Sequence, residues 1–441
     1  MRLIKLITIL SFIIMAPGFN ACSSDDSQSF VRVKGEQFIL NGNPYYYFGA
    51  NFWHGAYLAA DLVKGDRDRL LKELDQLAEY KITNLRIMAA SEESALEMSV
   101  KPAFQTAPRV YNEELLKGLD FLMAELAKRN MKAVLVLNNY WQWSGGMSQY
   151  INWVTGEEII DPDKTGDWDG FQEQSAKFYI NDEANAIYRD YIRMLVNRKN
   201  TVTGVVYKND SNIMAWQLGN EPRPAPDAAE NPINRKAFID WVYSTSDYIK
   251  SLDPNHLVST GNEGTMGSRF DMSIYSEAHQ CPNIDYLTFH IWPKNWGWYK
   301  VHDTSSFEPS LQNTLDYFAE HVEKAAELNK PTVLEEFGLE RDGGSFSPDT
   351  TTAYRDRYLD ALFSKVVEKA KDGSPMAGLN FWAWGGMART QSAGFIWKPG
   401  DSFMGDPPQE PQGLNSVFSS DTSTLKIFEK YNTQLDALIK P

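Results

Sequence analysis

The stretch Ile-Met-Ala-Trp-Gln-Leu-Gly-Asn-Glu-Pro-Arg-Pro, Ile213–Pro224, decides how the whole chain is interpreted. Its apolar first half has the length of a buried strand, and it ends abruptly at Asn220, Glu221 and Pro222. Pro222 lacks a backbone N–H and restricts the residue before it, so a helix cannot run back through Glu221. The pattern therefore predicts a carboxylate at the end of a strand, where the chain turns into a loop.

A second stretch, Pro331–Gly338, has the same form: Pro-Thr-Val-Leu-Glu-Glu-Phe-Gly is an apolar run that ends in carboxylates. Because side chains alternate along a strand, we expect only one of Glu335 and Glu336 to point inward. We choose Glu336, which lies nearer the strand end. A single such glutamate would more simply be a salt-bridged or surface carboxylate. Two at two strand ends are what glycoside hydrolysis needs, one as acid and one as nucleophile or base.

Short apolar runs alternate with amphipathic helical patterns along most of the chain, as in the leucines of Arg67–Tyr80. The predicted strands are Tyr45–Ala50, Thr83–Met88, Lys132–Leu137, Ile213–Gln217, Leu257–Ser259, Tyr286–Phe289, Thr332–Leu334 and Gly378–Phe381. Eight such units make an α/β fold, the (β/α)₈ TIM barrel, whose active sites form at the C-terminal ends of the strands. Both glutamates fall at that end. We expect a β-hairpin at Phe30–Asn43 and long irregular loops over 146–181 and 385–415.

The N-terminus has a short basic segment, the apolar run Leu6–Ala16 and then small and turn residues before Cys22. The run is too short to span a membrane as a mature helix. The pattern resembles a bacterial lipoprotein signal peptide over 1–21, with Cys22 as the lipid-bearing residue and a polar acidic tether over 22–29. Residues 30–441 are then one catalytic domain. The expected location is the surface-exposed outer membrane of a Gram-negative bacterium, with membrane contact through the lipid anchor only.

Composition narrows the classes of partner. Of 441 residues, 43% are hydrophobic, so the chain can bury a large core. The net charge of −15 argues against nucleic acid and anionic lipid as partners, because both require basic patches. The 13 Trp and 21 Tyr are many for this length, and they can form core or offer the flat faces on which sugar rings stack. The two cysteines, Cys22 and Cys281, have no Cys/His cluster of zinc spacing around them, so we expect no metal and no cofactor. Oligomeric state stays open.

Polar residues at other predicted strand ends complete a candidate site. Arg86 lies inside an apolar strand and needs a buried anionic partner. The nucleophile is the obvious one, and Arg86 would hold it ionised. Asn220 is expected to hydrogen-bond the 2-OH of the sugar, and His290 to orient either glutamate. Glu263, a third acid at a strand end, is expected to stabilise a loop.

Tryptophans at the same end of the barrel are candidates for sugar contacts. Trp382 ends the eighth strand and would form the floor of the sugar site, with Trp384 as its rival. Further subsites at the rim are expected at Trp53, Asn139 and Trp292, although plain packing is the alternative for each.

At this point the motifs resemble glycoside hydrolase family 5 of the clan A barrels. The resemblance rests on Trp216–Pro222, Leu334–Gly338, Asn84-Leu85-Arg86 and the tryptophan of strand eight. Asn138-Asn139-Tyr140 and the run 197–208 resemble its β-mannanase subfamily. The resemblance implies retaining double displacement, with Glu221 as acid/base, Glu336 as nucleophile and β-1,4-mannan as the substrate.

We therefore expect an endo-1,4-β-mannanase. An exo-acting β-mannosidase of the subfamily and a β-1,4-glucanase of the same fold are the alternatives, and a catalytically inactive glycan-binding protein would have lost one carboxylate. One departure from the family stands out. Many members have His-x-Tyr after strand six, whereas this chain has His290-Ile291-Trp292, so another group would have to supply the tyrosine hydroxyl to the nucleophile.

Overall fold

Eight parallel strands form the centre of the computed structural model, which describes residues 30–62 and 65–439. In chain order they are β4 Tyr47–Asn51, β5 Asn84–Met88, β8 Lys132–Val136, β9 Ile213–Gln217, β10 Leu257–Ser259, β11 Leu287–Ile291, β12 Thr332–Phe337 and β13 Met376–Phe381. The spatial order is β10-β9-β8-β5-β4-β13-β12-β11. The predicted TIM barrel is confirmed. The expected signal peptide, Cys22 and tether lie outside the described residues.

The seam between β10 and β11 closes the barrel through single bonds in place of a ladder. The Asp285 amide donates to the Val258 carbonyl at 2.8 Å, and the His290 amide donates to the Glu263 carbonyl at 3.1 Å. The barrel is therefore nearly closed, and its weakest-paired junction lies beside His290.

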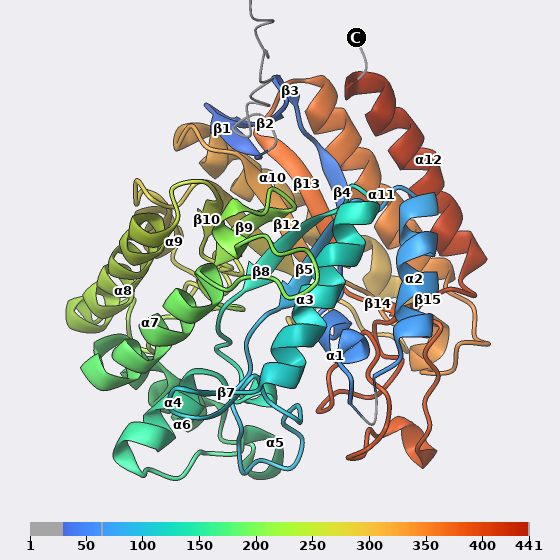
Figure 1. Cartoon of the computed structure of the whole chain (residues 1–441). Helices are drawn as coiled ribbons and strands as arrows, with labels where there is room; N and C mark the ends of the chain where they lie inside the picture. The colour runs from blue at the N-terminus through green and yellow to red at the C-terminus, as the bar shows by residue number, and fades with distance from the viewer. Residues whose placement is uncertain (1–29, 63–64, 440–441) are drawn as a thin grey trace, which may run out of the picture.

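Helices surround the strands (Figure 1). They are α2 Arg67–Glu79, α3 Glu113–Lys128, α7 Asp182–Val196, α8 Pro232–Leu252, α9 Met272–His279, α10 Phe307–Glu327, α11 Ala353–Lys371 and α12 Thr422–Ile439, with a short α1 Gly55–Ala59 after β4. Several begin at a side chain that caps the free backbone N–H groups, such as Asp66 for α2 and Asn112 for α3. The eight-residue α9 has no predicted counterpart, because its length gives too little periodicity. None of the helices in the described ranges is long and apolar enough to cross a membrane.

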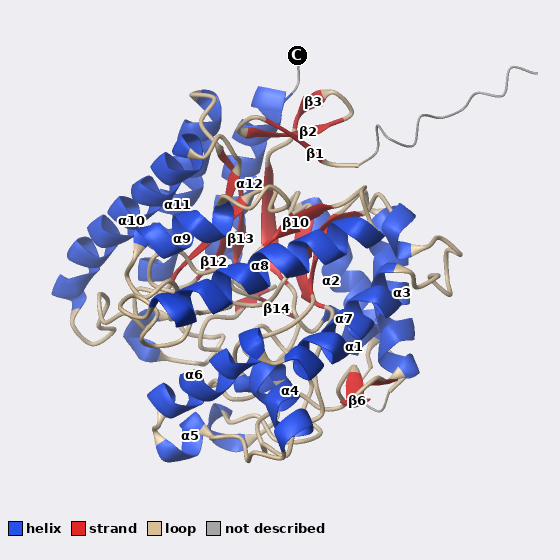
Figure 2. Ribbon diagram, turned by 90° about the vertical axis from the view of Figure 1, so that its left-hand side faces the viewer, coloured by secondary structure: helices blue, strands red, loops and turns tan. Residues whose placement is uncertain are grey.

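A small antiparallel sheet covers the N-terminal end of the barrel. It consists of β1 Arg32–Lys34, β2 Gln37–Leu40 and β3 Asn43–Pro44, so the predicted hairpin has a third strand. Phe38 packs there with Met214 and Tyr286 beneath the barrel strands. This sheet lies at the end of the molecule opposite α4–α6 (Figures 1 and 2), which leaves the C-terminal ends of the strands free for a site.

The expectation that 146–181 is irregular is wrong. This segment forms α4 Gly146–Thr155, α5 Pro162–Thr165, α6 Trp168–Ala176 and a 3₁₀ turn, η3 Lys177–Ile180. The elements are too short to give a clear period, which is why pattern alone missed them. The second long segment, 385–415, is largely loop, and β14 Trp384–Gly386 pairs with β15 Val417–Phe418 at its two ends.

Candidate active site

A pocket of about 570 Å³ opens at the C-terminal ends of the barrel strands. Its polar lining includes Glu221, Glu336, Arg223, Glu263 and Glu410. Its aromatic lining consists of Trp141, Trp143, Trp168, Trp292, Trp296 and Trp382. A hollow of about 670 Å³ beside α8 is open to solvent and contains neither strand-end glutamate. The chemistry therefore belongs to the pocket at the barrel mouth.

Glu221 follows β9 in a backbone conformation that few non-glycine residues adopt, with φ of +50°. Its amide donates to the Gly261 carbonyl at 2.9 Å. His290 Nδ1 lies 2.7 Å from one carboxylate oxygen, and the indole N–H of Trp141 donates to the other at 2.6 Å. Neighbouring elements thus hold this carboxylate in a fixed position at the pocket floor.

Glu336 sits at the end of β12, where the pairing with β11 shifts: Phe289 pairs with Leu334, but His290 pairs with Glu336. Glu336 forms an ion pair with Arg86, and its other oxygen lies 3.5 Å from His290 Nδ1. Glu335 accepts a hydrogen bond from Gln217 at 2.6 Å.

The expectation that only one of Glu335 and Glu336 points inward is wrong. Glu335 lies 3.7 Å from Arg86 Nε, so both neighbours approach the same guanidinium. The irregular register between β11 and β12 breaks the simple alternation and permits this arrangement.

Arg86 is 2% exposed and has the buried anionic partner that its position requires. Its remaining N–H groups donate to Gln217 at 2.8 Å, Asn51 at 3.0 Å and Asn220 at 2.9 Å. These amide oxygens fix the plane of the guanidinium, so Arg86 positions Glu336 as well as balancing its charge.

Glu221, His290 and Glu336 each place one nitrogen or oxygen atom within 4.8 Å of the others. Retaining glycosidases hold their two carboxyl groups about 5–5.5 Å apart and inverting ones about 6.5–9.5 Å, so the close approach of one oxygen pair agrees with the retaining arrangement. Three such ligands could also approach a cation. However, the Arg86 guanidinium and the Trp141 indole N–H already occupy oxygens of the two glutamates. We therefore interpret the three residues as a group that shares protons.

The pKa values of these groups depend on one another. Burial raises the pKa of Glu336 to about 7, against the opposing charges of His290 and Arg86. Burial also acts to raise the pKa of Glu221, but the hydrogen bond and charge of His290 outweigh it and bring that pKa to about 2. Burial lowers the pKa of His290, but the charges of Glu336 and Glu221 raise it by more, so the net shift of this pKa is upward.

The raised pKa of Glu336 differs from the expectation that Arg86 keeps Glu336 ionised. The physical reason is that one guanidinium serves both Glu335 and Glu336, so burial outweighs it. The protons of the three groups leave in steps that belong to the cluster and not to one residue.

Other predicted site residues lie where they can act. Asn220, Trp292 and Trp382 line the pocket, and Trp382 meets Trp292 edge-on at 6.0 Å between ring centroids. Asn220 accepts from Arg86, which leaves it beside Glu336. Among the described residues, Arg86 and His290 are the groups that bond to the Glu336 carboxylate. The expected hydroxyl donor is therefore not found there.

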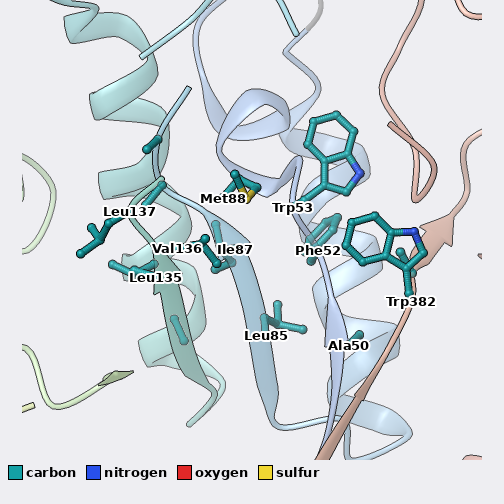
Figure 3. Packing of buried hydrophobic residues seen from close by; sticks show 14 of the residues in the cluster. Ala50, Phe52, Trp53, Leu85, Ile87, Met88, Leu135, Val136, Leu137 and Trp382 are labelled. Atoms are coloured by element: carbon teal, nitrogen blue, oxygen red, sulfur yellow. The ribbon is translucent and has the colours of Figure 1, made fainter. Parts of the chain in front are cut away.

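Three predicted contact residues do not line the pocket. Trp53 is 1% exposed, packs near Trp382 (Figure 3) and donates its indole N–H to the Gly405 carbonyl at 2.8 Å. Trp384 is fully buried in β14. Asn139 lies behind Asn220, whose amide it accepts at 3.1 Å. Loop 385–415 covers Trp53, and the pairing of β14 with β15 keeps Trp384 out of the pocket. Asn139 supports the site from behind Asn220.

Sequence reasoning missed several lining residues. Arg223 follows the Asn-Glu-Pro motif directly, so proximity was an available signal. Trp168 lies on α6, which the pattern did not reveal, and Glu410 lies far along the 385–415 loop with no local signal. Glu263 does stabilise a loop, as expected, because it accepts from Arg223 Nε at 2.9 Å, but it also lines the pocket.

A (β/α)₈ barrel with paired glutamates at the ends of β9 and β12, in a pocket lined by tryptophans, defines a glycoside hydrolase. Comparison with known proteins agrees. A family profile described as "GH family 5 beta-mannosidase-like" matches residues 28–440. The chain belongs to this family of glycoside hydrolases.

Relatives divide between two activities. A mannan endo-1,4-beta-mannosidase 4 of Solanum lycopersicum is 30% identical over 81% of this chain and 83% of its own. The crystal structure of a glycoside hydrolase family 5 mannosidase from Rhizomucor miehei is 38% identical, with a TM-score of 0.85 over 93% of this chain and 99% of that one. An endo-1,4-beta-mannanase structure from the same fungus is 23% identical with a TM-score of 0.66, which supports the fold alone.

Proposed function

We propose that this protein hydrolyses β-mannosidic bonds with retention of configuration. The observation that carries the proposal is the spacing of Glu221 and Glu336, whose oxygens approach within 4.8 Å on a shared histidine. Glu336 attacks the anomeric carbon while Glu221 delivers a proton to the departing oxygen. A covalent glycosyl-enzyme forms, and Glu221 then takes a proton from the water that hydrolyses it.

The proton needed for this step is held by the cluster. His290 Nδ1 lies 2.7 Å from Glu221 and 3.5 Å from Glu336, so one imidazole N–H is within reach of both carboxylates. Attack requires Glu336 without a proton and the Glu221–His290 pair with one. Arg86, fixed by three amide oxygens, stabilises the Glu336 carboxylate once its proton has passed to the Glu221–His290 pair.

We further propose that the enzyme removes mannose from chain ends. Pro407, Gln409, Glu410 and Pro411 from the 385–415 loop form part of the pocket wall. The charge of Glu336 contributes to the raised pKa of Glu410, about 8 with burial as the largest cause, so this wall lies close to the nucleophile. The same choice is supported by the 38% identity and the TM-score of 0.85 to the Rhizomucor miehei mannosidase.

Internal cleavage of mannan is the second candidate. It is favoured by the names of two plant relatives that are 30–31% identical to this chain. They are mannan endo-1,4-beta-mannosidase 4 of Solanum lycopersicum and "Putative mannan endo-1,4-beta-mannosidase 4" of Arabidopsis thaliana. The tryptophan-lined side of the pocket, with Trp141 and Trp168, offers room for sugar units beyond the cleaved bond.

The deciding experiment compares the products released from mannohexaose and cellohexaose, with Glu336→Ala as the inactive control. Mannose alone from the first time point supports the exo-enzyme, and mixed short oligomers support the endo-enzyme. The anomer formed first, followed by NMR, tests retention. Turnover of cellohexaose with mannohexaose untouched would overturn the substrate.

The lipid anchor remains a proposal based on residues 1–29. We propose that Cys22 carries lipid and holds the enzyme on the outer membrane, facing outward. Metabolic labelling with an alkyne fatty acid should mark the wild type and not Cys22→Ala. Protease treatment of intact cells should then remove the enzyme if it is surface-exposed.

A further inference from the structure

A third buried carboxylate, Glu263, lies at the β10–β11 seam and is only 2% exposed. It lines the pocket, and its carboxylate is paired with Arg223. A buried carboxylate is unfavourable unless it is paired, so its partners indicate its task.

The side chain of Glu263 acts on Trp141 through one intermediate. Arg223 donates to the same Glu263 oxygen from Nε at 2.9 Å and from Nη2 at 2.5 Å. The guanidinium of Arg223 also stacks on the Trp141 ring, 4.8 Å from its centroid. The planar guanidinium of Arg223, held by the Glu263 carboxylate, thus supports the face of the Trp141 indole, whose N–H donates to Glu221.

The main chain of Glu263 acts on the second donor. Its carbonyl accepts the backbone N–H of His290 at 3.1 Å, and His290 Nδ1 binds the other oxygen of Glu221. The segment before it also holds the acid loop, since Gly261 accepts the amide of Glu221 and Asn262 donates to the Pro222 carbonyl at 3.0 Å. Both donors to Glu221 are therefore braced from one residue.

We propose that Glu263 is a positioning residue for the general acid, acting through Arg223 and Trp141 on one side of Glu221 and through His290 on the other. This inference rests on the proposed retaining mechanism, in which Glu221 protonates the departing oxygen. Its role is to keep the Glu221 carboxyl aimed at that oxygen, in a backbone conformation that glutamate does not favour by itself.

The first test uses two aryl β-mannosides of similar size, phenyl and 2,4-dinitrophenyl, which differ in how much they need a proton to depart. Glu263→Gln keeps the shape of the side chain and loses its charge, and Arg223→Met removes the guanidinium. We expect each to lower kcat/KM for the phenyl mannoside about 10- to 100-fold, the range for supporting residues, and to leave the dinitrophenyl mannoside within a few-fold of wild type.

A matched control is the partly exposed ion pair of Arg235 with Glu277 on α8 and α9, at 2.7 Å. Arg235→Met removes an arginine of the same kind outside the pocket and should leave both substrates unchanged. Arg223→Lys, which keeps the charge but not the flat guanidinium, should recover only part of the phenyl activity.

The second test is a double-mutant cycle with Trp141→Phe, which keeps the ring and removes the indole N–H. If Arg223 acts through that N–H, its replacement should add little in the Trp141→Phe background. Additive losses, or equal losses on both aryl mannosides, would overturn the inference while the retaining mechanism stands. If the wild type hydrolyses neither mannoside, removal of mannose from chain ends fails, and the same comparison on aryl glycosides of a mannose oligomer tests the inference under internal cleavage.

Discussion

Two buried clusters of arginine and carboxylate lie in this molecule, and they differ in how their charges are matched. In the first, Arg341 and Arg355 both bind Asp421, at 2.7 and 2.6 Å, with side chains at most 3% exposed. Both oxygens of Asp421 are occupied, one also accepting the Phe418 amide at 2.9 Å, and Arg355 donates further to the Ser416 carbonyl. This cluster joins α11 to the start of α12, and we call it closed because both carboxylate oxygens are already bound.

The cluster at the barrel mouth has the opposite balance. One arginine, Arg86, faces Glu335 and Glu336, and the shared His290 lies beside Glu221, on which the charge of Arg223 also acts. Carboxylates exceed cations, and two of them line an open pocket. An excess of buried carboxylate thus raises a pKa and leaves a reactive oxygen available, whereas a carboxylate whose two oxygens are both bound by arginines only holds elements together.

Removing the nucleophile should give the largest effect. We expect Glu336→Gln to lower kcat by about 10⁴-fold or more, as loss of a covalent catalyst does. Its melting temperature should be equal to or above that of the wild type, because Arg86 keeps Glu335 and three amide acceptors while one crowded carboxylate disappears. Single-turnover kinetics and calorimetry measure the two quantities. A large fall in melting temperature would mean that this cluster is structural as well.

Removing the acid should have the next largest effect. Glu221→Ala should lower kcat/KM for phenyl β-mannoside about 10²- to 10⁴-fold, the usual range for a proton-transfer catalyst. With the dinitrophenyl mannoside the first step should survive, so azide should restore turnover and yield a β-mannosyl azide. An α-azide product would contradict retention.

Opening the closed cluster should affect stability and not chemistry. Asp421→Asn leaves two buried guanidinium groups facing each other without an anion, so we expect a loss of about 3–5 kcal/mol in the free energy of unfolding. Urea denaturation measures this, and kcat/KM per folded molecule should match the wild type. A specific loss of activity would show that the two clusters communicate.

The smallest expected effect is a pH dependence of stability. Glu336 has a native pKa of about 7 against an ordinary 4.5, so between these values the native state binds more protons than the unfolded state. The free energy of unfolding should therefore fall as pH rises from about 4.5 to 7, by at most about 1.4 kcal/mol per pH unit for one group.

Glu336→Gln lacks this contribution and should show a shallower fall. Glu92 and Glu410, with pKa values raised to about 8 chiefly by burial, act in the same direction and keep some slope in both proteins. The pKa of Glu221 is lowered, so its contribution is lost only below pH 4.5 and does not interfere. Melting temperatures from pH 5 to 8 test this. Equal slopes in the two proteins would contradict a raised pKa of Glu336.

Much of the fold could be predicted from the sequence because long strands and helices show their hydrophobic periodicity in a short local window. β9 and β10 agree with the predicted bounds residue for residue, and the two strand-end glutamates follow from the same pattern. Short elements are harder to predict, because α4 to α6 have too few turns to give a period. The sequence therefore predicts loop for the pocket wall that carries Trp168.

Local patterns in the chain were enough to predict the barrel, the placement of Glu221 and Glu336 at its C-terminal end, and the need of Arg86 for an anion. Which residues share protons, and which hold them in position, depends on contacts that form when the chain folds. The Arg86–Glu336 contact joins residues 250 positions apart, and the Trp141–Glu221 contact joins residues 80 apart. Such pairings depend on barrel closure and on the irregular register of β11 and β12, and a local period cannot encode either. For that reason Trp53 and Glu263 look alike as strand-end candidates, yet one is packed in the core and the other faces the pocket.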